Sequence, residues 1–351
     1  MDKAKQPLSL QKKRLIVLFS LIGALIVLFI VSIFIGSSGM SFIDGLKALF
    51  RTGDETNITI IYNIRLPRIL AALLAGIALA ISGTIMQSVS NNDMASPSTL
   101  GVSNAAVLGA NIAIIILGNG VISAHGSKVD ISNPYLVSGF AFLFALICTV
   151  LVLGLARIKK FSPSTTVLIG VAMGTFFTGL TTIIQYFASD TTLASAVFWS
   201  FGDLGRANYN DLLILLIPTV ISLAFFLIFS YRYNALLLGD DSAKTLGINL
   251  KVFRFISLLL ASLLCGISVS LFGIIGFVGL LAPQIMKRIV GNDHKILIIT
   301  SALFGAVLLL ICDILAKTIL GGLSLPVGAV TSLLGAPIFI VILLTRGKKH
   351  G

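Results

Sequence analysis

Charged residues are scarce in this chain. Only 11% of its 351 residues are Asp, Glu, Lys or Arg, whereas 57% are hydrophobic and the mean hydropathy is +1.06. A soluble domain carries about 25% charged residues, so the composition excludes a water-soluble enzyme. Surplus apolar residues belong in lipid, and 33 Gly suit the close helix packing found there. The composition predicts a polytopic membrane protein.

Cysteine and histidine are also rare, with three residues of each. Cys148, Cys265 and Cys312 lie far apart inside apolar runs, which fits neither a disulfide framework nor a metal motif. We expect them to be small packing residues. The histidines lie in polar stretches without a second ligand nearby, and no cluster of His, Asp or Ser predicts a membrane-embedded enzyme. The sequence therefore predicts no metal site and no catalytic residues.

Ten hydrophobic runs are candidate membrane spans, because a spanning helix needs about 20 apolar residues. The runs cover residues 15–35, 66–89, 100–117, 136–156, 165–188, 212–231, 255–272, 274–286, 296–316 and 327–344. The eighth run is short and contains Pro283, so we expect a kinked or tilted helix there. The prediction is an all-α protein with one ten-span domain over residues 15–345, between basic segments at 1–14 and 346–351.

The net charge of +12 follows this topology. Ten spans place both termini on the same side of the membrane, and 18 of the 25 basic residues fall in segments on that side. Cytoplasmic loops are enriched in Lys and Arg. We therefore expect both termini in the cytoplasm and the chain in a bacterial cytoplasmic membrane. The same distribution explains the positive charge without a nucleic-acid partner.

Acidic residues lie almost entirely outside the predicted spans. Asp313 is the exception, and Lys317 follows it by four residues, on the same helix face. Mutual neutralisation of the two is the simpler prediction; the alternative is an ion-coupled transporter in which Asp313 titrates. Residues 239–245 lack the Gly before Lys that a phosphate-binding loop needs. The energy source is thus expected on another protein, such as an ATPase.

Several motifs follow one another along the ten runs. They are Arg65-Leu66-Pro67-Arg68, Met94-Ala95-Ser96-Pro97, Leu100-Gly101, residues 238–247, Gly276-Phe277-Val278-Gly279-Leu280 with Pro283, Leu325-Pro326-Val327-Gly328, and Gly335-Ala336-Pro337. In this order the chain resembles the permease subunits of ABC importers for iron–siderophore complexes, haem and cobalamin, the FecCD-like or type II importer permeases. The resemblance covers about residues 15–345. Asp93 and Gln284 depart from it, because Pro and His are common at these positions in the family.

The resemblance implies a permease rather than an enzyme. A second permease subunit, identical or paralogous, completes the translocation path. Two cytoplasmic ATPase subunits bind ATP and Mg²⁺, so this chain is expected to hold no cofactor. An extracytoplasmic substrate-binding lipoprotein or periplasmic protein delivers the cargo. Ferric siderophores are the expected cargo because they are the commonest in the family, with haem and cobalamin as alternatives.

The resemblance also assigns a docking site for the binding protein. In the family, basic residues at the positions of Arg65, Arg68 and Lys317 pair with Glu residues on its two lobes. Lys317 departs from the Arg usual there and offers a point charge in place of a bidentate fork. The alternative roles are snorkelling of the arginines to lipid headgroups and pairing of Lys317 with Asp313.

Residues 234–253 resemble the family's coupling region, which fits a groove on the ATPase. Its predicted contact residues are Gly239, Asp240, Asp241, Ala243, Leu246 and Gly247. The two aspartates are suited to cap a short helix, and the two glycines permit sharp turns. We expect the Ala and Leu side chains to form a small apolar knob. The alternative is an ordinary solvated loop with one helical turn.

Overall fold

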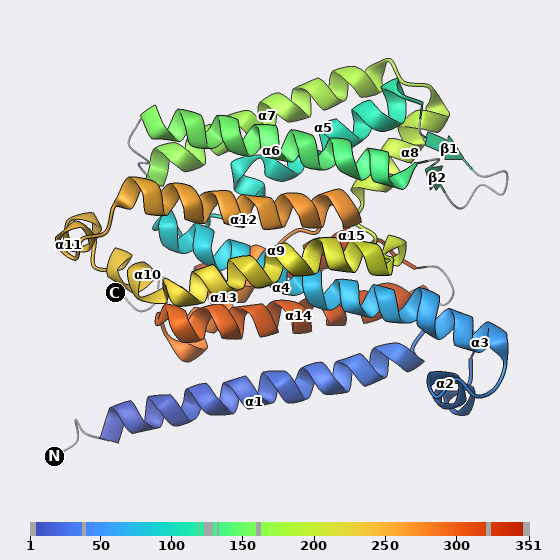
Figure 1. The fold of residues 1–351 in the computed structure, drawn as a ribbon, viewed down its shortest axis with the longest axis horizontal. Helices are drawn as coiled ribbons and strands as arrows, with labels where there is room; N and C mark the ends of the chain where they lie inside the picture. The colour runs from blue at the N-terminus through green and yellow to red at the C-terminus, as the bar shows by residue number, and fades with distance from the viewer. Residues whose placement is uncertain are drawn as a thin grey trace.

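The computed structural model of the chain describes residues 5–36, 40–118, 120–122, 129–131, 133–158, 163–320 and 324–346. It is a bundle of long helices that run roughly parallel or antiparallel to one another (Figure 1). The α-helices are α1 (Lys5–Phe34), α2 (Phe42–Leu49), α3 (Glu55–Thr59), α4 (Leu66–Val89), α5 (Val102–Asn111), α6 (Pro134–Ile158), α7 (Pro163–Tyr186), α8 (Asp190–Ser200), α9 (Tyr209–Ile228), α10 (Ser230–Leu236), α11 (Asp240–Thr245), α12 (Leu250–Phe272), α13 (Val278–Val290), α14 (His294–Thr318) and α15 (Val327–Arg346). Short π-helical and 3-10 segments extend or join them: η1 (Ile60–Arg65), η2 (Ser98–Leu100), η3 (Ile112–Ile116) and η4 (Leu204–Arg206).

Each of the ten predicted runs forms helix, which confirms an all-α polytopic fold. Within the described residues, eight helical segments are long and apolar enough to cross a membrane. The third predicted run forms the shorter apolar helix Val102–Ile116. The eighth forms α13, which has 13 residues and contains Pro283. Its shortness agrees with the expectation of an irregular span.

The loops predicted on the outer side contain structure that hydropathy does not reveal. They hold the short helices α2, α3 and α8, together with the strands β1 (Gly120–Ile122) and β2 (Val129–Ile131). The two strands pair antiparallel, with Gly120 opposite Ile131. Both are rich in β-branched Val and Ile, which favour strands. This hairpin is a small exception to the helical architecture.

Helix α4 is the centre of the bundle and packs against α9, α12, α13 and α14. Glycines allow its closest contacts. A Cβ on Gly76 would lie 2.5 Å from the carbonyl oxygen of Gly305 in α14, and one on Gly83 would lie 1.7 Å from that of Gly279 in α13. No side chain fits in either place. Helix backbones can therefore touch where lipid supplies no hydrophobic force to drive helices together.

Helix α1 lies at the edge of the bundle and packs mainly on α14 (Figure 1). Large apolar side chains such as Ile16, Phe19 and Ile26 are exposed along it. In a bilayer this face of α1 contacts lipid.

The bundle has two distinct ends. Arg14 of α1 and Asn234 of α10 both contact Asp293, which precedes α14, while Arg288 of α13 donates to the carbonyl of Ile342 in α15. The start of α1, the end of α15 and the short helix α11 therefore share one end, which we call the α11 end; α2, α3 and the hairpin lie at the other, the α2 end (Figure 1). By the positive-inside prediction the α11 end faces the cytoplasm.

Candidate functional site

The two arginines of the first motif lie inside a longer helical segment than predicted. The predicted span begins at residue 66, but the helix runs over Glu55–Val89 and includes the π-helical turn η1. Arg65 and Arg68 therefore lie within the helical segment and not at its start. Polar residues such as Asn57 and Asn63 lower the hydropathy of this stretch without ending the helix.

Asp313 of α14 is the centre of a charged cluster at the α2 end. Its carboxylate is fully buried. Oδ1 accepts a hydrogen bond from Nε of Arg68 at 2.7 Å, and Oδ2 lies 2.5 Å from Nζ of Lys317. The predicted pairing of Asp313 with Lys317 is confirmed, and Arg68 joins it from the central helix. A buried carboxylate is tolerated only with such partners.

The cations of this cluster also reach neighbouring elements. Arg68 donates from Nη2 to Oγ of Ser324 at 2.8 Å, and Lys317 donates to Oγ of Ser32 at 3.4 Å. Arg65 donates from Nη1 to the carbonyl oxygen of Ile33. The cluster thus ties α4 and α14 to the last turn of α1.

The cluster carries excess positive charge. Arg65 and Arg68 both act electrostatically on Lys317, so the three cations share one neighbourhood around the single carboxylate of Asp313. Only 6% of Arg65 and 11% and 8% of the Arg68 and Lys317 side chains are exposed. The structure therefore brings the three predicted docking residues together. Charges set in such low-dielectric surroundings attract an acidic surface more strongly than charges in open water.

The predicted coupling segment forms a compact turn of helix. Gly239 and Gly247 have φ values of 98° and 77°, the left-handed region that favours glycine, so the expectation of two sharp turns is confirmed. The helix between them is α11. Asp240 makes no capping bond; its carboxylate accepts from Nη1 and Nη2 of Arg254 at 3.0 and 2.6 Å. Asp240 therefore fastens α11 to α12.

One expectation for this segment is wrong. Ala243 is fully buried against the rest of the chain, so its side chain does not form an exposed knob. Leu246 and Leu238 are 65% and 70% exposed and supply an apolar surface instead. The helix has six residues, and its small residue Ala243 faces the rest of the chain.

Asp241 and Lys244 form an exposed pair on α11, with 2.8 Å between Oδ1 and Nζ. The hydrogen bond and charge of Lys244 lower the pKa of the Asp241 carboxyl, and the same contact raises the pKa of Lys244. Both side chains are in solvent, where such pairs contribute little stability.

A second polar cluster at the α11 end joins the two residues that depart from the family pattern. Gln284 donates to the carbonyl oxygen of Asp93 at 2.8 Å and to Oε1 of Gln87 at 2.9 Å. Lys287 forms an ion pair with the Asp93 carboxylate at 2.7 Å. These four residues line a cavity of about 350 Å³. Sequence reasoning identified both departures without showing that they are in contact.

His294, at the start of α14, belongs to a buried hydrogen-bond network that sequence reasoning missed. Its Nδ1 and its backbone N–H donate to Oδ1 of Asn234 at 2.8 and 2.9 Å, and its Nε2 lies 2.5 Å from Oγ of Ser88. A carboxamide oxygen only accepts, so Nδ1 carries a proton, and Oγ of Ser88 also donates to the carbonyl oxygen of Thr84 at 2.7 Å. The network joins α4, α10 and α14. Ser88, a polar residue late in the second apolar run, was the feature of the sequence that could have indicated this network.

These clusters consist of ion pairs and hydrogen bonds. Within the part of the chain that the structure describes, no three His, Cys, Asp or Glu side chains gather closely enough to hold a metal ion. Cys148, Cys265 and Cys312 are buried and free, which confirms that they are packing residues.

Residues 24–345 match the model of the FecCD transport family. The chain is 44% identical over 328 residues to the "Putative ABC transporter permease protein MJ0087" of Methanocaldococcus jannaschii, covering 93% of this chain and 94% of the relative. It is 33% identical to the hemin transport system permease protein HmuU of Yersinia pestis, over 94% of this chain and 97% of that protein. It is 35% identical to the vitamin B12 import system permease protein BtuC of Salmonella typhi, over 82% and 84%.

A solved structure has a similar fold. It is described as "An inward-facing conformation of a putative metal-chelate type ABC transporter" and has a TM-score of 0.80 to this chain. The two are 29% identical, and the similarity covers 93% of this chain and 98% of the other.

Proposed function

Because the chain belongs to the FecCD transport family, whose permeases are not themselves enzymes, we propose that it is the permease subunit of an ATP-driven importer that accepts its cargo from an extracytoplasmic binding protein. The observation that carries the proposal is the cationic cluster at the α2 end. By the predicted topology, this end faces the outside.

The Asp313 cluster is suited to bind carboxylates of a docking partner. Asp313 neutralises one positive charge and fixes the positions of Arg68 and Lys317, while Arg65 leaves the cluster with further positive charge. An arginine has five N–H donors, and the hydrogen bonds of Arg68 to Asp313 and Ser324 use two of them. Acidic side chains of the binding protein take the remaining donors when it docks. Complementary charge of this kind guides encounter and register.

At the α11 end, the coupling segment is proposed to seat in a groove on the ATPase. The segment is exposed through Leu238 and Leu246, and its base is fixed by the Asp240–Arg254 pair. A rigid base with an apolar contact surface transmits movement of the ATPase to α12 rather than absorbing it. Gly239, Asp241, Ala243 and Gly247 shape the segment.

The importer requires partners beyond this chain. We propose a second permease, identical or paralogous, two ATPase subunits that bind ATP and Mg²⁺, and the binding protein. This chain then needs no cofactor of its own and performs no hydrolysis. The complex sits in the cytoplasmic membrane, with both termini of this chain inside.

The proposed cargo is a ferric siderophore, the commonest cargo of such permeases. Relatives at 33% and 35% identity carry the names of a hemin and a vitamin B12 system. Haem and cobalamin are therefore the alternatives to be tested beside it.

The test is uptake into proteoliposomes that contain this permease with its cognate ATPase and binding protein. Ferric siderophore, haem and cobalamin are supplied separately, with ATP inside the vesicles or with a proton gradient alone. We expect ATP-dependent uptake of the siderophore, abolished by Leu246→Glu in the coupling segment and retained in Leu10→Glu on exposed α1. Uptake driven by the proton gradient without ATP, and lost in Asp313→Asn, would establish a secondary transporter instead.

A further inference from the structure

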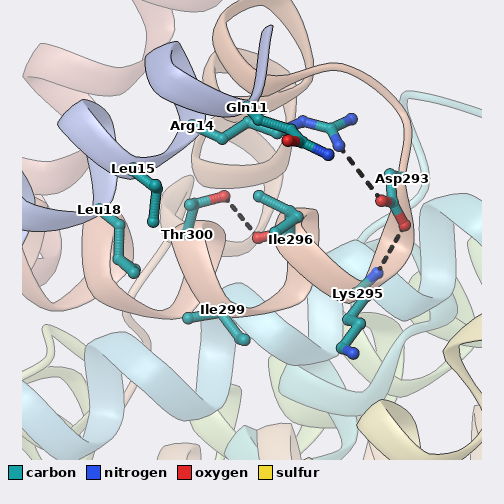
Figure 2. Close-up of a pocket in the computed structure, with 9 residues that line it drawn as sticks. All are labelled: Gln11, Arg14, Leu15, Leu18, Asp293, Lys295, Ile296, Ile299 and Thr300. Carbon is teal, nitrogen blue, oxygen red and sulfur yellow. Dashed lines mark hydrogen bonds and ion pairs between the residues drawn. The ribbon is translucent and has the colours of Figure 1, made fainter. Parts of the chain in front are cut away.

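A groove between α1 and α14 at the α11 end has apolar walls. Leu15 and Leu18 come from α1, and Ile296 and Ile299 come from α14 (Figure 2). The cavity measures about 420 Å³, within the roughly 300–1,000 Å³ of small-ligand sites. Its walls continue the lipid-facing surface of α1, so in a bilayer an acyl chain has direct access to it.

The mouth of the groove is basic. Arg14 donates from Nε to the carbonyl oxygen of Val290 at 3.0 Å, which holds its guanidinium at the rim. Its contact with Asp293 is long, 3.4 Å from Nη1 to Oδ2, and leaves other N–H donors for a ligand. Lys295 lines the groove from α14 with an exposed side chain, and its ammonium makes no hydrogen bond or ion pair within the described residues.

Asp293 offsets only one of the two positive charges at the mouth. Its carboxylate also accepts from the backbone N–H of Lys295 and from Nδ2 of Asn234, each at 3.2 Å, so it is occupied as the N-cap of α14. Lys12 and Lys13, the two residues before Arg14 on α1, are exposed. The mouth of the groove is therefore net positive, and the apolar walls of the groove begin beside it.

We propose that this groove binds one anionic phospholipid of the cytoplasmic leaflet. Its phosphate lies between Arg14 and Lys295, and an acyl chain lies along the apolar walls. A basic mouth above an apolar groove matches such a lipid in charge and in polarity, and basic pockets between membrane helices on the cytoplasmic side bind anionic headgroups. The bound lipid fastens α1 to α14, its main neighbour. The proposal depends on the membrane location of the chain and not on its cargo.

The test is native mass spectrometry of the purified full chain, titrated with phosphatidylglycerol or with phosphatidylcholine of the same acyl chains. We expect one phosphatidylglycerol to be retained, roughly tenfold more tightly than phosphatidylcholine. In the double variant Arg14→Gln, Lys295→Gln this preference falls to about one. Lys251→Gln removes an exposed basic residue at the start of α12 and leaves the preference unchanged.

A second variant separates the groove from general surface charge. Ile299→Trp fills the groove without altering charge, and we expect it to abolish the tightly bound lipid while the melting temperature without lipid stays near that of the wild type. Equal retention of the two lipids, or a preference that survives both the double variant and Ile299→Trp, overturns the proposal. Dimers that carry no lipid and dissociate on Ile299→Trp would assign the groove to a second copy of the chain, which also overturns it.

Discussion

Two groups of ion pairs at opposite ends of the bundle differ in their exposure to solvent. At the α2 end, the carboxylate of Asp313 is fully buried and is held by Arg68 and Lys317 from two helices. At the α11 end, Asp241 and Lys244 pair on the surface of a single short helix, with side chains 96% and 61% exposed. When one partner of a buried pair is removed, the other charge is left without a counter-ion and without water. When one partner of an exposed pair is removed, water solvates the charge that remains.

This difference separates a rigid end from an adaptable one. The buried cluster fixes the positions of its cations, as the proposed docking of a binding protein requires. Helix α11 is held at its base by the Asp240–Arg254 pair, and its outer face is exposed, as the proposed contact with an ATPase requires. The long helices α4 and α14 connect the two ends.

The largest effect is expected from Asp313→Asn. The change leaves Arg68 and Lys317 buried without their counter-ion, which we expect to lower the free energy of unfolding by about 3–5 kcal/mol. Unfolding in mixed micelles at increasing SDS, followed by tryptophan fluorescence, measures it. Glu55→Gln, which removes an exposed acid at the same end, is the control and should change little. An equally stable Asp313→Asn protein would show that the α2 end does not depend on the buried pair.

The connection between the ends is tested by Gly83→Ala. The new methyl group would lie 1.7 Å from the carbonyl oxygen of Gly279, so α4 and α13 must move apart. Overpacking of this kind costs about 1–3 kcal/mol, measured by the same SDS titration. Gly154→Ala on α6, where a Cβ meets nothing within 4 Å, is the matched control. If both variants behave alike, the close approach of α4 and α13 is not needed.

A smaller and local effect is expected from Asp240→Ala. Loss of its carboxylate frees α11 from α12, and hydrogen bonds to charged groups contribute about 1.5–3 kcal/mol. The rate of trypsin cleavage after Lys244 should therefore rise, with a smaller loss in the free energy of unfolding than in Asp313→Asn. Asp241→Ala serves as the control, since it removes only the exposed pair. Faster cleavage in Asp241→Ala than in Asp240→Ala would reverse the assigned roles of the two aspartates.

The smallest effect concerns the pKa values of the exposed pair. Lys244 lowers the pKa of Asp241 below 3.8, so its contribution is present at neutral pH and is lost as pH falls through this lowered value. Asp241 raises the pKa of Lys244 above 10.5, so that contribution is lost as pH rises through the raised value. Roughly 1 M salt screens charges beyond about 3 Å. In an NMR titration at this salt, both pKa values should move back toward 3.8 and 10.5; unchanged values would indicate a less exposed pair.

Much of the fold followed from the sequence because lipid imposes simple rules. Apolar runs predicted the helices, and the i,i+4 spacing predicted the ion pair between Asp313 and Lys317. The position of Arg68 could not be predicted, because its contact with Asp313 spans 245 residues of sequence. The contact between Asp93 and Gln284 was hidden for the same reason, although both positions were recognisable as departures from the family.

The predictions that the structure overturned, the start of the second helix and the exposure of Ala243, failed for physical reasons as well. Hydropathy placed the start of the second span at residue 66, because the polar residues that follow Glu55 mask a helix that continues through η1. Ala243 was expected on the surface because its segment resembles the coupling region that contacts the ATPase. Its burial, like the Asp240–Arg254 pair beside it, is a tertiary feature that the local sequence does not reveal.

The most direct test of the docking site is the affinity of the binding protein for the permease. The triple variant Arg68→Gln, Lys317→Gln, Asp313→Asn removes both ion pairs of Asp313 together and keeps groups that can hydrogen-bond, so no member of these two pairs is left buried without its partner. We expect affinity for the reconstituted transporter to fall roughly 30-fold or more, corresponding to about 2 kcal/mol, while Lys47→Gln on exposed α2 leaves it unchanged. Wild-type affinity in a correctly folded triple variant would contradict the assignment of this cluster to docking.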